Sequence, residues 1–135
     1  MKKTKNLQTK EAYDAELSMR EKLKNIKSKN LIKLLKHYHE KDEYVTIYEH
    51  YGTCLDWKNH SHLQIIKKIL KNDGVVLKHM IKEIAKGINQ LSQKKFIHGA
   101  LSLENIFMRI SETKNNVKVE GSIKIGNLHR CFKLS

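Results

Sequence analysis

Residues 97–107 read IHGALSLENIF and lie between two segments of different periodicity. Before them, residues 76–91 carry apolar side chains at helical spacing, which predicts a helix with one continuous apolar stripe. After them, Ile106–Ile110 predicts a strand, Ser111–Asn116 a polar turn and the region near Ser122–Ile125 a last strand. We therefore expect the quoted residues to form a loop that connects a core-packing helix to a β-hairpin.

The N-terminal half of the sequence predicts the remaining elements. Apolar residues recur at helical spacing between Thr9 and Ile26, and Thr9 with an acidic residue close behind it is a favourable helix start. Leu31–Tyr38 and Tyr44–His50 are rich in β-forming residues and are joined by a charged turn, so they predict a hairpin. His62–Leu70 predicts a short helix. The expected order is helix, hairpin, two helices, loop and hairpin.

The chain has 135 residues, which suffices for one small domain. It is basic, with 27 Lys+Arg against 14 Asp+Glu and a formal net charge of +13, and such a charge attracts nucleic acid. Only Arg20, Arg109 and Arg130 are arginines, however, and both base reading and bidentate phosphate binding favour arginine. Lysines scattered over every segment indicate a solvated surface. A basic nucleic-acid-associated protein is therefore not favoured and is kept as an alternative.

The sequence carries no signal for a membrane or for secretion. No apolar run approaches the roughly 20 residues that a membrane-spanning helix needs, and no apolar stretch follows the charged N-terminus. Cys54 and Cys131 lie far apart in the sequence and suit reduced thiols. We expect an intracellular protein, cytoplasmic and without a membrane partner.

Taken in order, these segments resemble a eukaryotic protein kinase domain. Residues 97–107 match the catalytic-loop pattern H-R-D-L-x-x-x-N, with His, Leu and Asn in register. Residues 122–129 (SIKIGNLH) stand where a kinase has its D-F-G triplet. Residues 84–91 resemble the helix before the catalytic loop, and residues 44–52 resemble the fifth strand running into the hinge.

This resemblance implies an α+β fold that is a partial kinase domain. Residues 1–51 would form part of the N-lobe and the hinge, and residues 52–135 the start of the C-lobe through the catalytic and metal-loop regions. The family's first two strands, its activation segment and its large C-lobe helices would be missing, so we expect a truncated domain. The apolar stripe at 76–91 would then be partly exposed, which invites a partner or aggregation.

The resemblance places substituted residues at the catalytic positions. Ala100 stands where a kinase has the aspartate that accepts the hydroxyl proton, and a methyl group accepts no proton. Ser102 replaces the catalytic-loop lysine, and Gly99 replaces the preceding arginine. The chain resembles a serine/threonine or tyrosine kinase in which no catalytic residue is intact, that is, a pseudokinase.

The resemblance implies ATP and Mg²⁺ as cofactors, but the metal positions carry no charge. Asn105 keeps the family's amide, whereas Asn127 replaces the D-F-G aspartate and lacks the negative charge that a hard cation prefers. Leu128 can fill the apolar role of the phenylalanine, and His129 replaces the glycine. The predicted metal ligands are Asn105 and Asn127, both weak.

Nucleotide-binding positions follow from the same resemblance. Lys2, or its neighbour Lys3, would be the lysine that contacts the phosphates, with Glu16 as its partner on the following helix. Adenine would meet the backbone of Glu49 and Tyr51 at the hinge.

Three further residues border this predicted pocket. Tyr48 would guard the space behind it and Phe107 would form part of its floor, although both aromatic rings also suit simple packing of the hairpin. Arg20 stands four residues after Glu16, where the family has an apolar side chain that stacks in the core. Since a buried unpaired arginine is costly, we expect a broken stack or a shifted register here.

Three functional hypotheses follow. The first is a catalytically inactive kinase-like domain that acts in signalling through contacts with other proteins, an active kinase among them. The second is a fragment of a longer protein kinase-domain protein that binds ATP. The third is the basic nucleic-acid-associated protein. Thermal stabilisation by ATP separates the first two hypotheses, and a steep salt dependence of nucleic-acid binding would favour the third.

Overall fold

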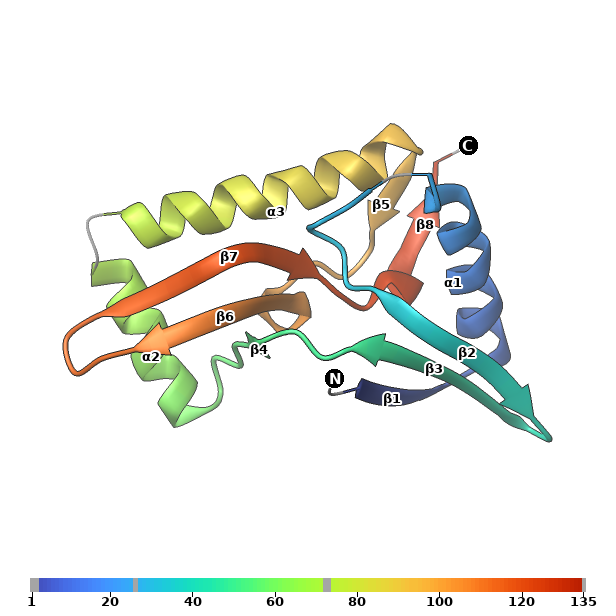
Figure 1. Cartoon of the computed structure of the whole chain (residues 1–135), viewed down its shortest axis with the longest axis horizontal. Coiled ribbons are helices and arrows are strands. Elements are labelled where there is room, and N and C mark those ends of the chain that lie inside the picture. Colours follow the sequence, from blue (N-terminus) through green and yellow to red (C-terminus); the bar gives the residue numbers. More distant parts are fainter. Residues whose placement is uncertain (1–2, 26, 72–73, 135) are drawn as a thin grey trace.

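The N-terminal part of the chain combines three antiparallel strands with one helix (Figure 1). A computed structural model describes residues 3–25, 27–71 and 74–134. Strands β1 (Lys3–Gln8), β3 (Glu43–Glu49) and β2 (Leu34–Glu40) form a sheet in the order β1-β3-β2. Helix α1 (Lys10–Leu23) follows β1 directly and packs beside β3. The predicted helix start is confirmed, because Thr9 Oγ1 accepts a hydrogen bond of 3.1 Å from the backbone N–H of Ala12.

The predicted hairpin is confirmed, but its first strand starts later than expected. The predicted strand began at Leu31, whereas β2 begins at Leu34. The backbone before β2 is hydrogen-bonded to the end of β7 instead. Ile32 N–H donates to Ile125 O at 2.9 Å, and Ile125 N–H donates to Asn30 O at 2.8 Å. This segment therefore joins the C-terminal sheet before the chain enters the N-terminal one.

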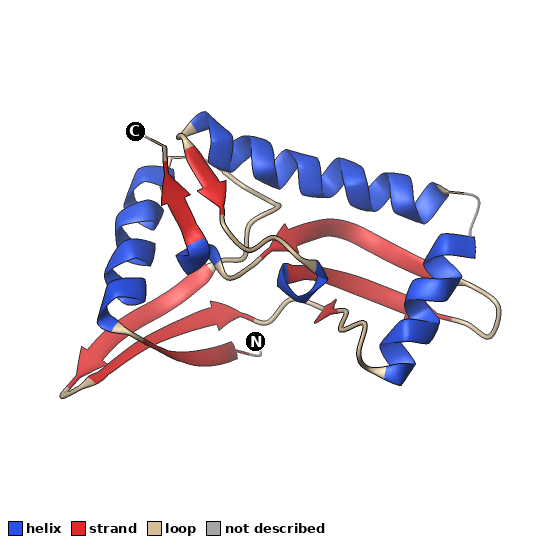
Figure 2. Ribbon diagram, turned by 180° about the vertical axis from the view of Figure 1, so that it is seen from behind, coloured by secondary structure: helices blue, strands red, loops and turns tan. Residues whose placement is uncertain are grey.

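The C-terminal part places two helices against a second sheet. Strands β4 (Thr53–Cys54), β6 (Ile106–Glu112) and β7 (Val117–Ile125) are ordered β4-β6-β7 and are antiparallel. Helix α2 (His60–Lys71) and the long helix α3 (Val75–Gln93) precede β6 in sequence, and α3 lies along β7 (Figure 2). The expected last strand near Ser122–Ile125 proves to be only the end of β7, which begins at Val117.

A short pair of strands brings the loop at 99–102 beside the turn at 126–127. Strand β5 (Phe96–His98) pairs with β8 (Cys131–Lys133) in antiparallel register. The 3-10 helix η1 (Leu103–Asn105) leads from the loop into β6, and the 3-10 helix η2 (Leu128–Arg130) leads from the turn into β8. Segments far apart in sequence thus meet at one place.

One apolar cluster joins the two parts of the described chain. It contains Met19 and Leu23 of α1, Leu91 of α3, Ile125 of β7 and Leu128 of η2. The predicted division into residues 1–51 and 52–135 stays a prediction, since this cluster draws on both sides of it. Within the described residues, no helix combines the length and the apolar character that crossing a bilayer requires.

Candidate active site

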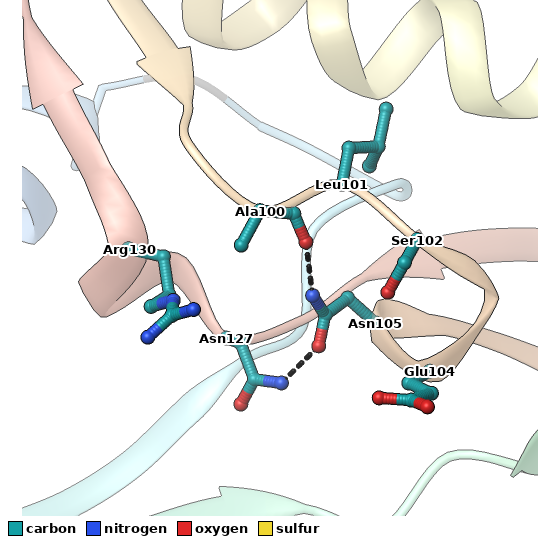
Figure 3. A pocket seen from close by; sticks show the side chains of 7 residues that line it. All are labelled: Ala100, Leu101, Ser102, Glu104, Asn105, Asn127 and Arg130. Carbon is teal, nitrogen blue, oxygen red and sulfur yellow. Dashed lines mark hydrogen bonds between the residues drawn. The ribbon is translucent and has the colours of Figure 1, made fainter.

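A polar pocket lies where the loop after β5 meets the turn after β7. Its volume is about 470 Å³. Both segments contribute to its lining, which consists of Ala100, Leu101, Ser102, Glu104, Asn105, Asn127 and Arg130 (Figure 3). The residues predicted at catalytic and metal-binding positions, namely Ala100, Ser102, Asn105 and Asn127, are therefore brought together in one pocket.

His98 fixes the backbone on both sides of this pocket. Its Nε2 donates a hydrogen bond of 2.9 Å to the carbonyl oxygen of Gly126, and its Nδ1 accepts one of 3.1 Å from the N–H of Ala100. The two bonds assign the hydrogen of the ring to Nε2. A second tie runs from Gly99 N–H to Arg130 O at 3.1 Å. The loop is thus held in place without any charged group.

Asn105 and Asn127 are bonded to each other through their side chains. Asn127 Nδ2 donates to Asn105 Oδ1, and Asn105 Nδ2 donates to the carbonyl oxygen of Ala100 (Figure 3). Asn105 is buried, and Gly126 N–H donates to its backbone oxygen at 2.7 Å. Asn127 adopts a left-handed backbone conformation with φ 53°, which Asn tolerates better than most residues. The amides close the space between the loop and the turn.

This donor set does not fit Mg²⁺. The ion prefers octahedral oxygen ligands that include carboxylates, whereas the side-chain oxygen of Asn105 is already occupied by the amide of Asn127. Asn105 and Asn127 offer only neutral amide oxygens, so neither supplies the negative charge that the ion prefers. Glu104 is the carboxylate of the pocket lining, but Figure 3 shows Asn105 lying between it and Asn127. No group of three or more His, Cys, Asp or Glu residues is placed to hold a metal in the described part of the chain.

Glu16 is fully buried and is held by three neighbours. Arg20 approaches its Oε2 through Nε at 3.3 Å and Nη2 at 3.1 Å. Gln8 Nε2 donates to its Oε1 at 3.2 Å, and the Tyr48 hydroxyl donates to the same oxygen. Arg20 also donates from Nη1 to the carbonyl oxygen of Ile32 at 2.7 Å. Arg20 is thus paired with Glu16 and reaches from α1 to the segment before β2, whereas the expected broken stack or shifted register at this position stays a prediction.

Two lysines were predicted as alternative partners of Glu16. Lys2 lies outside the described residues, and the backbone of Lys3 stands opposite Glu49 at the start of β1. Burial raises the pKa of the Tyr48 hydroxyl, and the negative charge of Glu16 raises it further. Tyr48 is therefore a hydrogen-bond donor to Glu16 at all ordinary pH values.

The predicted hinge residues Glu49 and Tyr51 direct their side chains to β7. Glu49 Oε1 contacts Lys124 Nζ at 2.7 Å and accepts a hydrogen bond of 3.0 Å from the N–H of Lys33. Tyr51 is buried, its hydroxyl donates to Ser122 O, and the cations of Arg109 and Lys124 each lie 4.5 Å from the centre of its ring. Burial raises the pKa of Tyr51. These contacts fasten the hinge segment to the C-terminal sheet.

Phe107 connects the hinge to the polar pocket. Its ring packs against the cluster formed by Ile32, Tyr48 and Tyr51. It also covers Gly126, where an added Cβ would lie 2.3 Å from the ring. Phe107 thus lies between the hinge and the turn that carries Asn127, and its role as part of a pocket floor stays a prediction.

Two contributors to these sites were missed from the sequence. Gln8 reaches Glu16, Thr46 and Tyr48 from β1, and the lysine-rich start of the chain gave no strand signal for it. Arg130 lines the pocket because η2 follows the turn directly. The pairing of Glu16 with Arg20 did have a signal, since residues four apart on a helix face each other.

The comparison with protein families agrees with this geometry. The family described as protein tyrosine and serine/threonine kinase matches residues 1–126. No curated protein matches the chain. The family match covers most of the sequence: it includes the loop at 97–107 and ends at Gly126. The chain belongs to the protein tyrosine and serine/threonine kinase family.

Proposed function

We propose that this chain is a catalytically inactive kinase-like domain that acts in intracellular, cytoplasmic signalling by binding other proteins, an active kinase among them. The observation that carries the proposal is the pocket in which Ala100 stands at the position of the proton acceptor, beside a closed pair of amides. Kinase catalysis consists almost entirely of positioning and electrostatic stabilisation. A domain of this family without those charges is suited to binding.

The missing base is the first argument. Transfer of a phosphoryl group to an alcohol needs an acceptor for the hydroxyl proton within hydrogen-bond reach. Ala100 presents a methyl group to the pocket, and its carbonyl oxygen already accepts from Asn105. Ser102 offers a hydroxyl where the family has a lysine, so no positive charge steadies the phosphoryl group from that position.

The closed amide pair is the second argument. Asn127 donates to Asn105, so a cation that entered between the two side chains would have to break this hydrogen bond and would gain no carboxylate. Glu16 is likewise engaged with Arg20, Tyr48 and Gln8. We therefore expect that any nucleotide bound at the hinge is bound without a metal ion.

A thermal-shift titration with ATP, with and without Mg²⁺, tests this proposal. The purified chain should show no Mg²⁺-dependent stabilisation and no transfer of labelled phosphate to protein acceptors. The matched control is the double variant Ala100→Asp/Asn127→Asp, in which both carboxylates return and Mg²⁺-dependent stabilisation should appear. Metal-dependent turnover by the unaltered chain, lost on Asn105→Ala or on substitution of Lys2, would overturn the proposal.

A further inference from the structure

A second pocket, apart from the candidate active site, lies between α1 and the segment that leads into β2. Its volume is about 430 Å³. The C-terminal half of α1, the residues just before β2 and the end of β7 line it, and Figure 1 shows α1 beside β2. No described residue lines both this pocket and the polar pocket at Asn105 and Asn127. It is therefore a separate cavity, which we call the α1 pocket.

The floor of the α1 pocket is apolar. Leu23 of α1 and Leu31 and Ile32 of the segment before β2 line it and are buried. Leu34, the first residue of β2, adds a fourth aliphatic side chain. None of these side chains donates or accepts a hydrogen bond, so the floor accepts an apolar group.

Four cationic side chains line the same pocket, whereas none of its described lining residues is acidic. The cations are Arg20, Lys24, Lys33 and Lys124. Three of them have carboxylate partners: Arg20 is paired with Glu16, Lys24 with Glu21 and Lys124 with Glu49. These carboxylates offset part of the positive charge. The side chain of Lys33 is exposed, and no carboxylate of the described residues pairs with its ammonium group.

Two of the cations are held in fixed positions. Arg20 makes three hydrogen bonds, two to Glu16 and one to the carbonyl oxygen of Ile32, and a guanidinium group has five N–H donors. The backbone of Lys33 is bonded to Glu49 twice: its N–H donates to Oε1 at 3.0 Å, and its carbonyl oxygen accepts from the N–H of Glu49 at 3.0 Å. A carboxylate in this pocket would therefore meet donors that are already in place.

The position of β2 favours an extended peptide as the occupant. Strand β2 is an outer strand of its sheet, which has the order β1-β3-β2, so one side of its backbone has no strand partner among the described residues. This strand starts at Leu34, a residue of the pocket lining. An extended segment can pair with such an edge while one of its side chains enters the adjoining pocket.

We propose that the α1 pocket binds a short, extended, acidic segment of a partner protein. This proposal rests on the proposed function and names the chemistry of the segment that is bound. One aromatic or large aliphatic side chain of the segment covers the apolar floor, and its neighbouring carboxylates face Arg20 and Lys33. The apolar side chain supplies most of the affinity, and the charges fix the position of the segment.

The probe is a fluorescein-labelled ten-residue peptide that carries one Phe with Glu on either side. Its affinity for the full chain is measured by fluorescence anisotropy at physiological salt. A peptide with Ala in place of the Phe should bind about tenfold more weakly, because it leaves the floor uncovered. A peptide with Lys in place of every Glu should not bind, since its charges repel those of the pocket.

A matched pair of charge reversals separates the pocket from the general attraction of a basic chain. Lys33→Glu should weaken binding of the probe about tenfold, and Lys33→Gln about threefold. The control is Lys118→Glu, which makes the same change in net charge at an exposed residue of β7 and should weaken binding less than about twofold. Only the backbone of Lys33 is bonded to Glu49, so urea denaturation should give both Lys33 variants the stability of the unaltered chain.

Three results would contradict the proposal. One is equal binding of the Phe and Ala peptides, because the floor would then contribute nothing. Another is an equal loss of affinity in Lys33→Glu and Lys118→Glu, which would show attraction by net charge alone. The third is tighter binding of anionic vesicles or of a single-stranded oligonucleotide than of the peptide, with that binding lost in Lys33→Glu. The proposed function fails separately, through metal-dependent phosphate transfer by the unaltered chain, and that result is independent of peptide binding.

Discussion

Replacing Arg20 by Met tests the role of the buried charge pair on α1. The carboxylate of Glu16 is fully buried, whereas the side chain of Arg20 is 19% exposed and reaches it from the next turn of the helix. In Arg20→Met the carboxylate keeps Tyr48 and Gln8 as donors but loses its counter-charge. The carbonyl oxygen of Ile32 loses a donor at 2.7 Å as well.

The size of the effect follows from these contacts. Removing one partner of a buried pair costs about 3–5 kcal/mol, because the other charge is left uncompensated. The partial exposure of Arg20 allows screening by water, so we expect the lower end, about 3 kcal/mol. For a chain of this length that loss lowers the melting temperature by roughly 10 °C. It would remove a large share of the stability of a typical small domain.

Equilibrium urea denaturation followed by far-ultraviolet circular dichroism measures this loss. The matched control is Lys24→Met on the same helix, whose pair with Glu21 has side chains that are 60% and 70% exposed and should contribute less than about 0.5 kcal/mol. The double variant Glu16→Gln/Arg20→Met should recover part of the loss, since no buried charge is then left unpaired. If Arg20→Met costs no more than Lys24→Met, the reasoning is refuted.

Three further predictions concern the backbone and the titrating groups. Gly52→Ala should lower the free energy of unfolding by about 2–4 kcal/mol in urea denaturation, because Gly52 has φ +58° and an added Cβ would lie 2.1 Å from the carbonyl oxygen of Met108. Gly74→Ala, at φ +80° with no atom within 4 Å of the added Cβ, should cost only about 1 kcal/mol, and equal losses would contradict the argument. Burial raises the pKa of Cys131 from 9.0 to about 11, so the folded state keeps a proton that the unfolded state releases. Its stabilising contribution is complete below pH 9 and is lost as the pH rises through 11; a pH series of urea denaturation should show a steeper fall for the unaltered chain than for Cys131→Ala. Hydrogen bonds from Lys86 and then Asn30 lower the pKa of Glu83 below 4.5. The stability difference between the unaltered chain and Glu83→Gln should therefore be present above pH 4.5 and shrink as the pH falls through the lowered value, and a difference that does not change with pH would contradict this assignment.

The elements with a local signal were predictable from the sequence. The apolar repeat at 76–91 and the cap at Thr9 correspond to α3 and α1, because helical spacing and capping depend on neighbours within one turn. Strand β1 was missed because its lysine-rich sequence has no β pattern, and it is held by pairing with β3 across a long separation. Strands β5 and β8 were missed for a related reason. Phe96 pairs with Lys133 far along the chain, and neither segment is long enough to show a period.

The candidate site was predictable as a set of positions, but its contacts were not. Order and spacing placed Ala100, Ser102, Asn105 and Asn127 together, and one pocket does contain them. That Asn127 donates to Asn105, and not to solvent, depends on the left-handed turn and on the pairing of β5 with β8, both of which are long-range results of the fold. The roles of Lys2, Glu16, Glu49, Tyr51 and Phe107 in nucleotide binding stay predictions.

In the loop and the turn, the residues that hold the backbone in place are different from those at the family's two aspartate positions. His98 ties the loop to Gly126, Asn105 ties it to Ala100, and Leu128 fills the main core. His98 and Asn105 match the family, Leu128 replaces its phenylalanine, and each of the three has a structural contact that would be lost on substitution. Ala100 and Asn127 differ from the family. At both positions the family has an aspartate, and the contacts around Ala100 and Asn127 do not require its carboxylate. These contacts hold the shape of the loop without the family's two carboxylates, which supports the binding role proposed above.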